Sequence, residues 1–149
     1  MTLEQLIPVL QIAIGPVILI SGVGLLILSM TNRLGRTIDR SRELVELRRR
    51  AGDNERIRLE LQLGILWRRA RLLRTAITLS GVAVLLDSLL MILLFLGALV
   101  KMRVAEVLAL AFVACMTALI GSILYFLRDI NLALQALCHE LQVETRDLP

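Results

Sequence analysis

The chain has 149 residues and a mass of 16.6 kDa, which is enough for one domain. Hydrophobic residues make up 57% of it and charged residues 20%, yet the two classes are segregated: residues 5–32 and 107–127 carry no charge, and residues 75–100 carry only Asp87. Each of these blocks has the length of about 20 residues that crosses a bilayer core. The composition therefore excludes an ordinary soluble enzyme, a secreted disulfide scaffold and a β-barrel.

In chain order, the pattern predicts an all-α membrane protein that forms a single membrane domain over residues 1–149. We expect three transmembrane spans, a cytoplasmic antiparallel helical hairpin and a C-terminal amphipathic helix. The segments are a span at 6–30, the hairpin at 31–74, a span at 75–100, a span at 107–127 and the amphipathic helix at 128–146.

The hairpin turns at Gly52-Asp53-Asn54, which is the only strong helix-breaking cluster between the first two spans. Because no proline or glycine cluster separates the hairpin from either span, each arm can continue its span as one long helix. The C-terminal segment repeats apolar residues with the i, i+4, i+7, i+11 spacing of an amphipathic helix that lies on the membrane surface or on the hairpin. These residues are Ile130, Leu134, Leu137 and Leu141.

The basic residues fix the expected orientation. Residues 31–74 hold 13 of the 17 basic residues, all arginine, and six acids, so their charge is +7 and that of the remainder is −3 within a net charge of +4. By the positive-inside rule, the hairpin and the C-terminus are cytoplasmic and the N-terminus and the link 101–106 lie outside a bacterial inner membrane. We expect no nucleic-acid partner, because no aromatic residues alternate with the arginines to stack bases.

The sequence contains no recognisable catalytic motif. Gly-x-Ser-x-Gly, His-Glu-x-x-His, a phosphate loop and Cys-x-x-Cys are all absent. Cys115 and Cys138 have no metal-ligand spacing, and His139 is the only histidine. We therefore expect no enzyme activity, no catalytic residue, no metal and no cofactor.

Two stretches carry a resemblance to a known family: SMTNRLGRTIDRSRELVE at 29–46 and RRARLLRTAITLSGVAVLLDSLL at 68–90. Together with the order of one span, an Arg-rich hairpin and a close pair of spans, they resemble the prokaryotic membrane-protein family known as domain of unknown function 2721. The resemblance covers about residues 6–137, and its most specific part is Asn32-Arg33-Leu34, Asp39-Arg40 and Arg42. It implies the architecture and brings no activity with it.

One stripe of the first helix is polar or small, whereas the rest of the first span is nearly all aliphatic. At 100° per residue, its members fall within about 40° of Glu4. They are Glu4, Pro8, Gln11, Gly15, Ile18, Gly22, Leu26, Ser29, Arg33, Arg36 and Arg40, and all except Pro8 are candidates for lining a pore. One interpretation is close helix packing. The other is a pore lining in a ring of subunits, with Ile18 and Leu26 as hydrophobic constrictions and the arginines as a cytoplasmic vestibule.

Asp87 lies near the expected bilayer midplane, where an ionised carboxylate costs about 2.5–3.5 kcal/mol. We therefore expect a partner rather than lipid around it. A hydrogen bond to Thr117 or to a neighbouring subunit is one interpretation, and an ion or proton site is the other.

The arginines divide into two groups. Those that border the second span are expected to contact anionic lipid headgroups, and they are Arg68, Arg69, Arg71 and Arg74. Those at the hairpin tip, Arg48–Arg50, lie too far from the membrane for that, so they are either solvated or bind an acidic cytoplasmic partner. The pattern Asp39-Arg40, Arg42-Glu43 and Glu46-Arg49-Arg50 also suits i, i+3 and i, i+4 ion pairs along an arm or between subunits.

The leading functional hypothesis is a small homo-oligomeric ion channel lined by the first span, with cations favoured by Glu4. Three spans cannot enclose a channel alone, so this hypothesis requires several copies. The alternative is a non-conducting membrane scaffold whose hairpin recruits a cytoplasmic partner, with the stripe packed against the other two spans.

Overall fold

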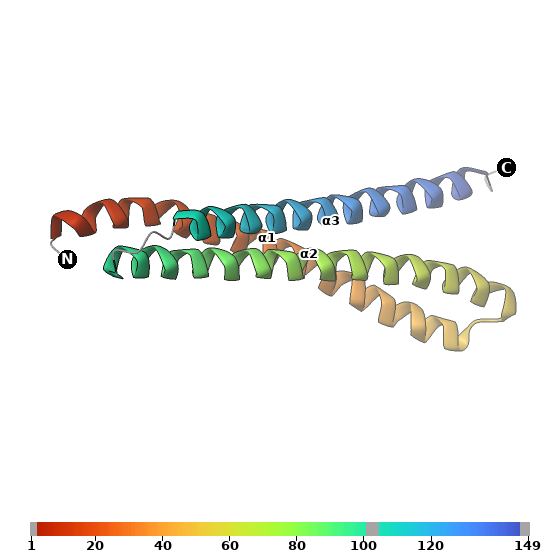
Figure 1. Cartoon of the computed structure of the whole chain (residues 1–149). Helices are drawn as coiled ribbons and strands as arrows, with labels where there is room; N and C mark the ends of the chain where they lie inside the picture. The colour runs from red at the N-terminus through yellow and green to blue at the C-terminus, as the bar shows by residue number, and fades with distance from the viewer. Residues whose placement is uncertain (1–2, 101–104, 147–149) are drawn as a thin grey trace. The chain divides into compact units, whose positions relative to one another are not determined.

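Three long helices make up the described part of the chain in the computed structural model (Figure 1). They are α1 (Leu3–Arg50), α2 (Asp53–Val100) and α3 (Ala105–Arg146). The structure describes residues 3–100 and 105–146, with the side chains at 3–6, 8–10, 12, 54, 100 and 136–146 left out. Within the described ranges there is no β-strand, so the fold is all-α as predicted.

Each helix is long and apolar enough to cross a membrane. The candidate spans fall within Ala13–Arg50, Glu55–Leu99 and Ala105–Gln135, and the mean hydropathy of their most apolar stretches is 2.3 to 2.6. Only 11–17% of each such stretch is buried inside the chain, so most apolar side chains face outward. A surface of that kind is stable in lipid or against other membrane helices, which identifies a multi-pass membrane protein.

The ends of the helices follow from local sequence. Between α1 and α2 lies the two-residue link Ala51–Gly52, and the carbonyl of Gly52 accepts a bond of 3.0 Å from the backbone N–H of Arg56. Three arginines in the last turn of α1 and two acids in the first turn of α2 complement the two helix dipoles. As the absence of breakers predicts, α1 and α2 each continue from span to arm as one helix.

In α3 the helix also continues without a break. Residues 128–146 belong to the helix that begins at Ala105, and no separate C-terminal helix follows the third span. Whether this segment is amphipathic in its surroundings and lies on a membrane surface stays a prediction.

Two compact units divide the chain, and each draws on all three helices. Unit 1 comprises Met1–Ser29 and Ile77–Ser122, and unit 2 comprises Met30–Ala76 and Ile123–Pro149. Among the described side chains of unit 1, only Asp87 and Glu106 are charged.

Close contact between α2 and α3 organises unit 1. The hydroxyls of Ser80 and Ser122 share a buried hydrogen bond of 2.6 Å, and the thiol of Cys115 donates to the carbonyl of Ala83 at 3.2 Å. A Cβ added at Gly121 would lie 3.5 Å from a methyl group of Leu79. Small residues and polar hydrogen bonds thus bring these two helices together, as is typical of membrane helices.

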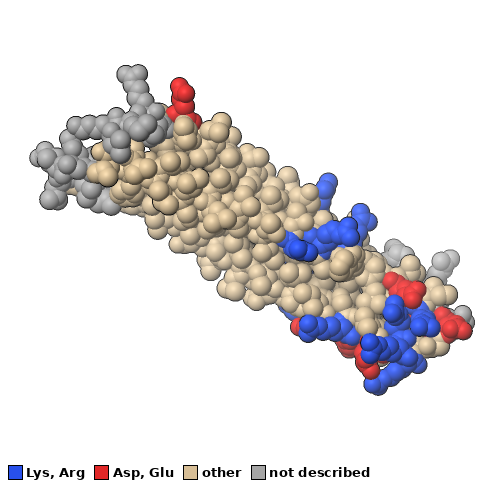
Figure 2. Space-filling model, turned by 60° about the horizontal axis from the view of Figure 1, so that its bottom comes forward, with Lys and Arg blue, Asp and Glu red and all other residues tan. Residues whose placement is uncertain are grey.

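In unit 2 the buried apolar residues are Met30, Leu44, Leu73 and Ala76. We refer to residues 30–50 as the α1 arm and to residues 53–76 as the α2 arm. The arms lie side by side (Figure 1), and near the link Arg48 of one is 3.6 Å from Glu60 of the other. On the face that Figure 2 shows, Arg, Asp and Glu side chains gather over this unit.

Candidate functional site

A buried carboxylate joins all three helices in unit 2. Asp129 of α3 is 0% exposed, and its Oδ1 accepts a hydrogen bond of 3.2 Å from the Nε of Arg69 in α2. Its Oδ2 lies 3.6 Å from the guanidinium of Arg33 in α1, which also sits over the ring of Phe126 at 5.5 Å from its centroid. We call Asp129, Arg33, Arg69 and Phe126 the Asp129 cluster.

The Asp129 cluster contributes little net free energy to folding, but it restricts how the three helices can pack. A buried ion pair loses much of its Coulomb energy to desolvation, so its net contribution to stability is small. Its requirement for a partner is strict, however, since a buried carboxylate without a cation costs several kcal/mol. The cluster therefore sets the axial position of α1, α2 and α3 relative to one another within unit 2.

The cluster differs from what the sequence suggested for its members. One interpretation of the sequence put Arg33 in a pore vestibule, and Arg69 was expected at lipid headgroups. In the structure both guanidiniums are directed to Asp129 and are only 27% and 20% exposed, and the two roles stay predictions. Sequence reasoning did not single out Asp129. The available signal was an acid that follows the third apolar block by two residues, at the depth where α1 and α2 carry arginines.

The stripe of α1 lies at the surface of unit 1. Gln11, Gly15, Gly22 and Ser29 are exposed, Ile18 is 66% exposed and Leu26 is half-buried. The face of α1 that packs within the unit carries Ala13 and Val23 instead. A Cβ added at Gly15 or Gly22 would meet nothing within 4 Å, so neither glycine serves a close contact inside the chain.

The remaining pore-lining candidates of the stripe are Arg36, Arg40 and Glu4, since Arg33 belongs to the Asp129 cluster. Arg36 and Arg40 of unit 2 are exposed, and Arg40 forms an ion pair of 2.7 Å with Glu43. The side chain of Glu4 lies outside the described residues.

Asp87 is buried in unit 1, with 2% of its surface exposed, beside a small hollow lined mostly by apolar side chains. The side chains around it include Leu19, Ile20, Val23, Ala83, Val84, Cys115 and Leu119. Its Oδ2 has no hydrogen-bond partner among the described residues.

The expected bond from Thr117 to Asp87 is not formed. The hydroxyl of Thr117 is exposed and donates to the carbonyl of Val113 in its own helix at 2.7 Å. The other two interpretations, a donor from a neighbouring subunit and an ion or proton site, both stay predictions.

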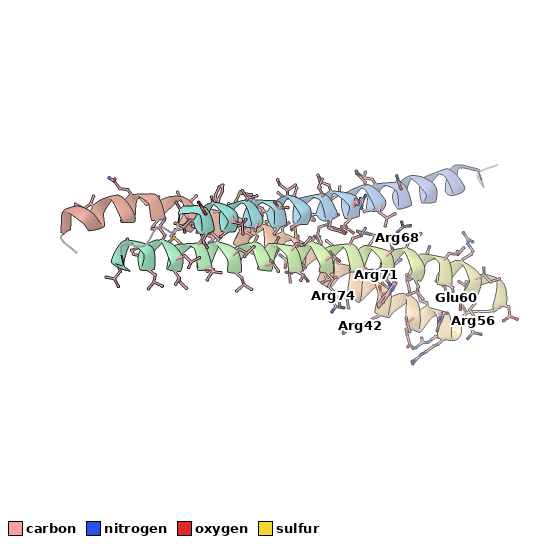
Figure 3. All side chains as sticks on the ribbon, viewed as in Figure 1. Arg42, Arg56, Glu60, Arg68, Arg71 and Arg74 are labelled. Carbon is pink, nitrogen blue, oxygen red and sulfur yellow. The ribbon has the colours of Figure 1, made fainter. Side chains whose placement is uncertain are left out.

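Three of the four arginines that border the second span are exposed, and they are Arg68, Arg71 and Arg74. Figure 3 shows them along the α2 arm, with Arg42 of the α1 arm projecting to the same side as Arg74 in that view. The guanidinium of Arg71 lies over the ring of Trp67 at 5.9 Å, and the ring itself is 67% exposed. Their exposure is compatible with lipid headgroups.

The tip arginines are engaged by acids of the same unit. Glu46 lies 3.9 Å from Arg49 and 2.9 Å from Arg50, which confirms the predicted i, i+3 and i, i+4 pairs. Arg48 lies 3.6 Å from Glu60, so each of the three tip arginines has a carboxylate within ion-pair distance. An acidic partner at the tip would therefore compete with existing ion pairs.

A groove lies between the two arms in unit 2. It has a volume of about 540 Å³ and is lined by Ile38, Ser41, Arg42, Val45, Glu46, Arg49, Leu63, Trp67 and Ala70. Its floor is apolar, and two arginines and one glutamate border it. Sequence reasoning did not foresee this groove, because it arises only where the arms meet.

The described residues contain no group of three or more histidine, cysteine, aspartate or glutamate side chains that could hold a metal ion. A comparison with protein-family models matches residues 13–139 to the family described as protein of unknown function, DUF2721. The chain belongs to this family. No curated protein and no solved structure matches the chain. Membership in DUF2721 confirms the resemblance seen at 29–46 and 68–90 and assigns no activity.

Proposed function

We propose that this protein assembles as a homo-oligomer in a bacterial inner membrane and that the assembly is an ion channel lined by α1. The observation that carries the proposal is the exposure of the α1 stripe in unit 1, where Gln11, Gly15, Gly22 and Ser29 face away from their own chain. A glutamine amide that faces hydrocarbon has no hydrogen-bond partner, so another copy or a water-filled axis has to supply one.

In this proposal the arms form a cytoplasmic antiparallel hairpin, and the N-terminus and the link between α2 and α3 lie outside. The 13 arginines of residues 31–74 support this orientation. Rings of Ile18 and Leu26 then constrict the pore by excluding water, and Glu4 favours cations at the outer end. Arg36 and Arg40 would border the cytoplasmic mouth.

The scaffold alternative has less support. It placed the stripe of α1 against the other two spans, whereas Gln11, Gly15 and Gly22 are exposed in unit 1. Its partner at the hairpin tip would have to compete with ion pairs, since Arg48, Arg49 and Arg50 lie beside glutamates.

Leak across a reconstituted bilayer tests the channel. Ile18→Ser should raise ion leak, because a polar ring admits water into an aliphatic constriction. Leu28→Ser is the matched control: Leu28 is 58% exposed and Ile18 66%, but Leu28 lies about 120° from Glu4 around the helix and off the stripe.

The subunit number is measured on the same samples by native mass. A pore needs about four or more copies, and a monomer or dimer would refute the channel. With an intact larger oligomer, equal leak from the two variants would mean a general disturbance of the bilayer, and absence of leak from Ile18→Ser would exclude a constriction there.

A further inference from the structure

The groove between the arms is unfilled by the described residues of its own chain. All of its lining residues come from α1 and α2, and none comes from α3. Toward the link Ala51–Gly52, α3 and the α1 arm diverge in Figure 1, and the α2 arm lies between them in that view. No described part of α3 therefore covers the apolar side chains of the groove. Ile38 is 40% exposed and Trp67 is 67% exposed, although the arms carry many charges. Such a combination marks an interaction surface.

We propose that this groove binds residues 130–146 of α3 from a neighbouring copy of the chain. We call these residues the α3 tail. The inference rests on the homo-oligomer proposed above and adds the contact that would hold its cytoplasmic side together. The recognition is that of an amphipathic helix in an apolar groove.

Axial register supports this choice of occupant. The Asp129 cluster places Asp129 of α3 level with Arg33 of α1, and both helices run onward from that level through unit 2. The groove begins five residues beyond Arg33, at Ile38, and ends 16 residues beyond it, at Arg49. Five to 16 residues beyond Asp129 are positions 134–145. In copies related by an axis along the membrane normal, the tail of one and the groove of another are therefore at the same height.

The tail has the side chains that such a groove requires. Its sequence repeats apolar residues at Ile130, Leu134, Leu137 and Leu141, and Leu134 is 55% exposed in its own chain. Glu140 and Glu144 fall within about two residues of the levels of Arg42 and Arg49 on the groove border. An apolar stripe flanked by acids is complementary to an apolar floor flanked by arginines.

Other occupants fit the groove less well. The hairpin of a second copy would meet its own charge, because residues 31–74 carry +7. By helix rise, the groove extends from about 7 to 24 Å beyond Arg33, whereas the headgroup layer is about 5–7 Å thick. A lipid would therefore reach only the end of the groove at Ile38.

Disulfide formation with the native thiol of Cys138 tests the contact in full-length protein in membranes. Ser41 lines the groove eight residues beyond Arg33, and Cys138 follows Asp129 by nine. Ser41→Cys should therefore give a covalent dimer on mild oxidation, because a disulfide needs Cα atoms about 4.4–6.8 Å apart. Cys115 is only 1% exposed, so it does not compete.

Glu43→Cys is the matched control. Glu43 is exposed on the same arm at nearly the same height but does not line the groove, and its removal makes the arm more attractive to an acidic tail. Random collisions would thus crosslink Glu43→Cys at least as well as Ser41→Cys. A covalent dimer from both variants at equal rates would overturn the proposal.

Native mass of the same samples separates this inference from the channel. An intact oligomer without a disulfide, or with a disulfide inside one chain, would overturn the tail contact and leave the channel standing. A monomeric wild-type protein would overturn both.

In the Ser41→Cys background, the double change Arg42→Glu and Arg49→Glu should slow dimer formation about fivefold. Adding Glu140→Arg and Glu144→Arg should restore it, and failure of this exchange would contradict the proposed charge complementarity.

Discussion

Asp129 links the three helices of unit 2 through one buried carboxylate. Its carboxylate is 0% exposed and faces the arginines of two other helices, whereas the arginines themselves keep some contact with the surroundings. The loss of the carboxylate would leave two guanidiniums close together without an anion between them. The loss of one arginine would leave the other to neutralise the charge.

We predict that Asp129→Asn lowers the free energy of unfolding in mixed micelles by about 3 kcal/mol, the lower end of the cost of breaking a buried ion pair. The lower end is expected because Arg33 and Arg69 are 27% and 20% exposed. Arg69→Leu should have a smaller effect on top of Asp129→Asn than in the wild type, since the interaction is already broken.

Glu43→Gln provides the comparison for that measurement. Glu43 also pairs with an arginine, Arg40, at 2.7 Å, but both side chains are more than half exposed. An exposed pair contributes about 0–1 kcal/mol, so this variant should unfold almost as the wild type does. Equal losses from Asp129→Asn and Glu43→Gln would contradict the assignment of a special role to the cluster.

For single residues, the sequence predicts burial better than it predicts contact partners. The burial of Asp87 follows from its place in an apolar block, and the structure indeed leaves it 2% exposed. The choice of Thr117 as its partner failed, because two residues at similar depth can point in different directions around their helices. The contact between Arg69 and Asp129, 60 residues apart, needs the arrangement of three helices, which no local pattern contains.

At the level of the elements, the long helices were the most predictable part of the fold. Span and arm merge in α1 and in α2 because strong helix formers run through both, and the single break at Ala51–Gly52 falls beside the predicted Gly52-Asp53-Asn54 turn. The groove between the arms was not predictable, since its shape depends on which faces of two helices meet. The angular position of the stripe on α1 followed from helix geometry, but its exposure did not.

Two glycines of α1 allow a test of whether the exposed stripe contacts another subunit. Gly22→Leu should leave the folded protomer intact and weaken the oligomer, because nothing lies within 4 Å of its added Cβ in the chain. Gly24→Leu is matched to it, since Gly24 is equally exposed and uncrowded but lies about 160° from Glu4 around the helix, off the stripe. Helical content and native mass give the two readouts.

A fall in native mass for Gly22→Leu alone would support an interface or pore axis at the stripe. Loss of the oligomer in both variants would indicate that any added bulk in α1 disturbs it. An intact oligomer in Gly22→Leu would exclude a close helix contact at the stripe and leave lipid or an open pore axis as its surroundings.

For the whole molecule, the composition alone predicted three membrane-crossing helices, and the orientation depends on the asymmetry of the arginines. In a Cys138→Ser background, Asn54→Cys should react with an impermeant thiol reagent only from the cytoplasmic side. Met102→Cys, at a position outside the described residues, should react only from the opposite side. Labelling in intact cells and in inverted vesicles measures both, and the reverse pattern would refute the positive-inside argument.

The position of Asp129 along the chain has a consequence for biosynthesis. Arg33 and Arg69 leave the ribosome well before Asp129, which follows Arg69 by 60 residues, so α1 and α2 enter the membrane with guanidiniums that have no counterion. Only the arrival of α3 supplies the carboxylate that pairs with both and fixes the register of the three helices in unit 2. The third helix thus supplies the anion that the arginines of the first two require.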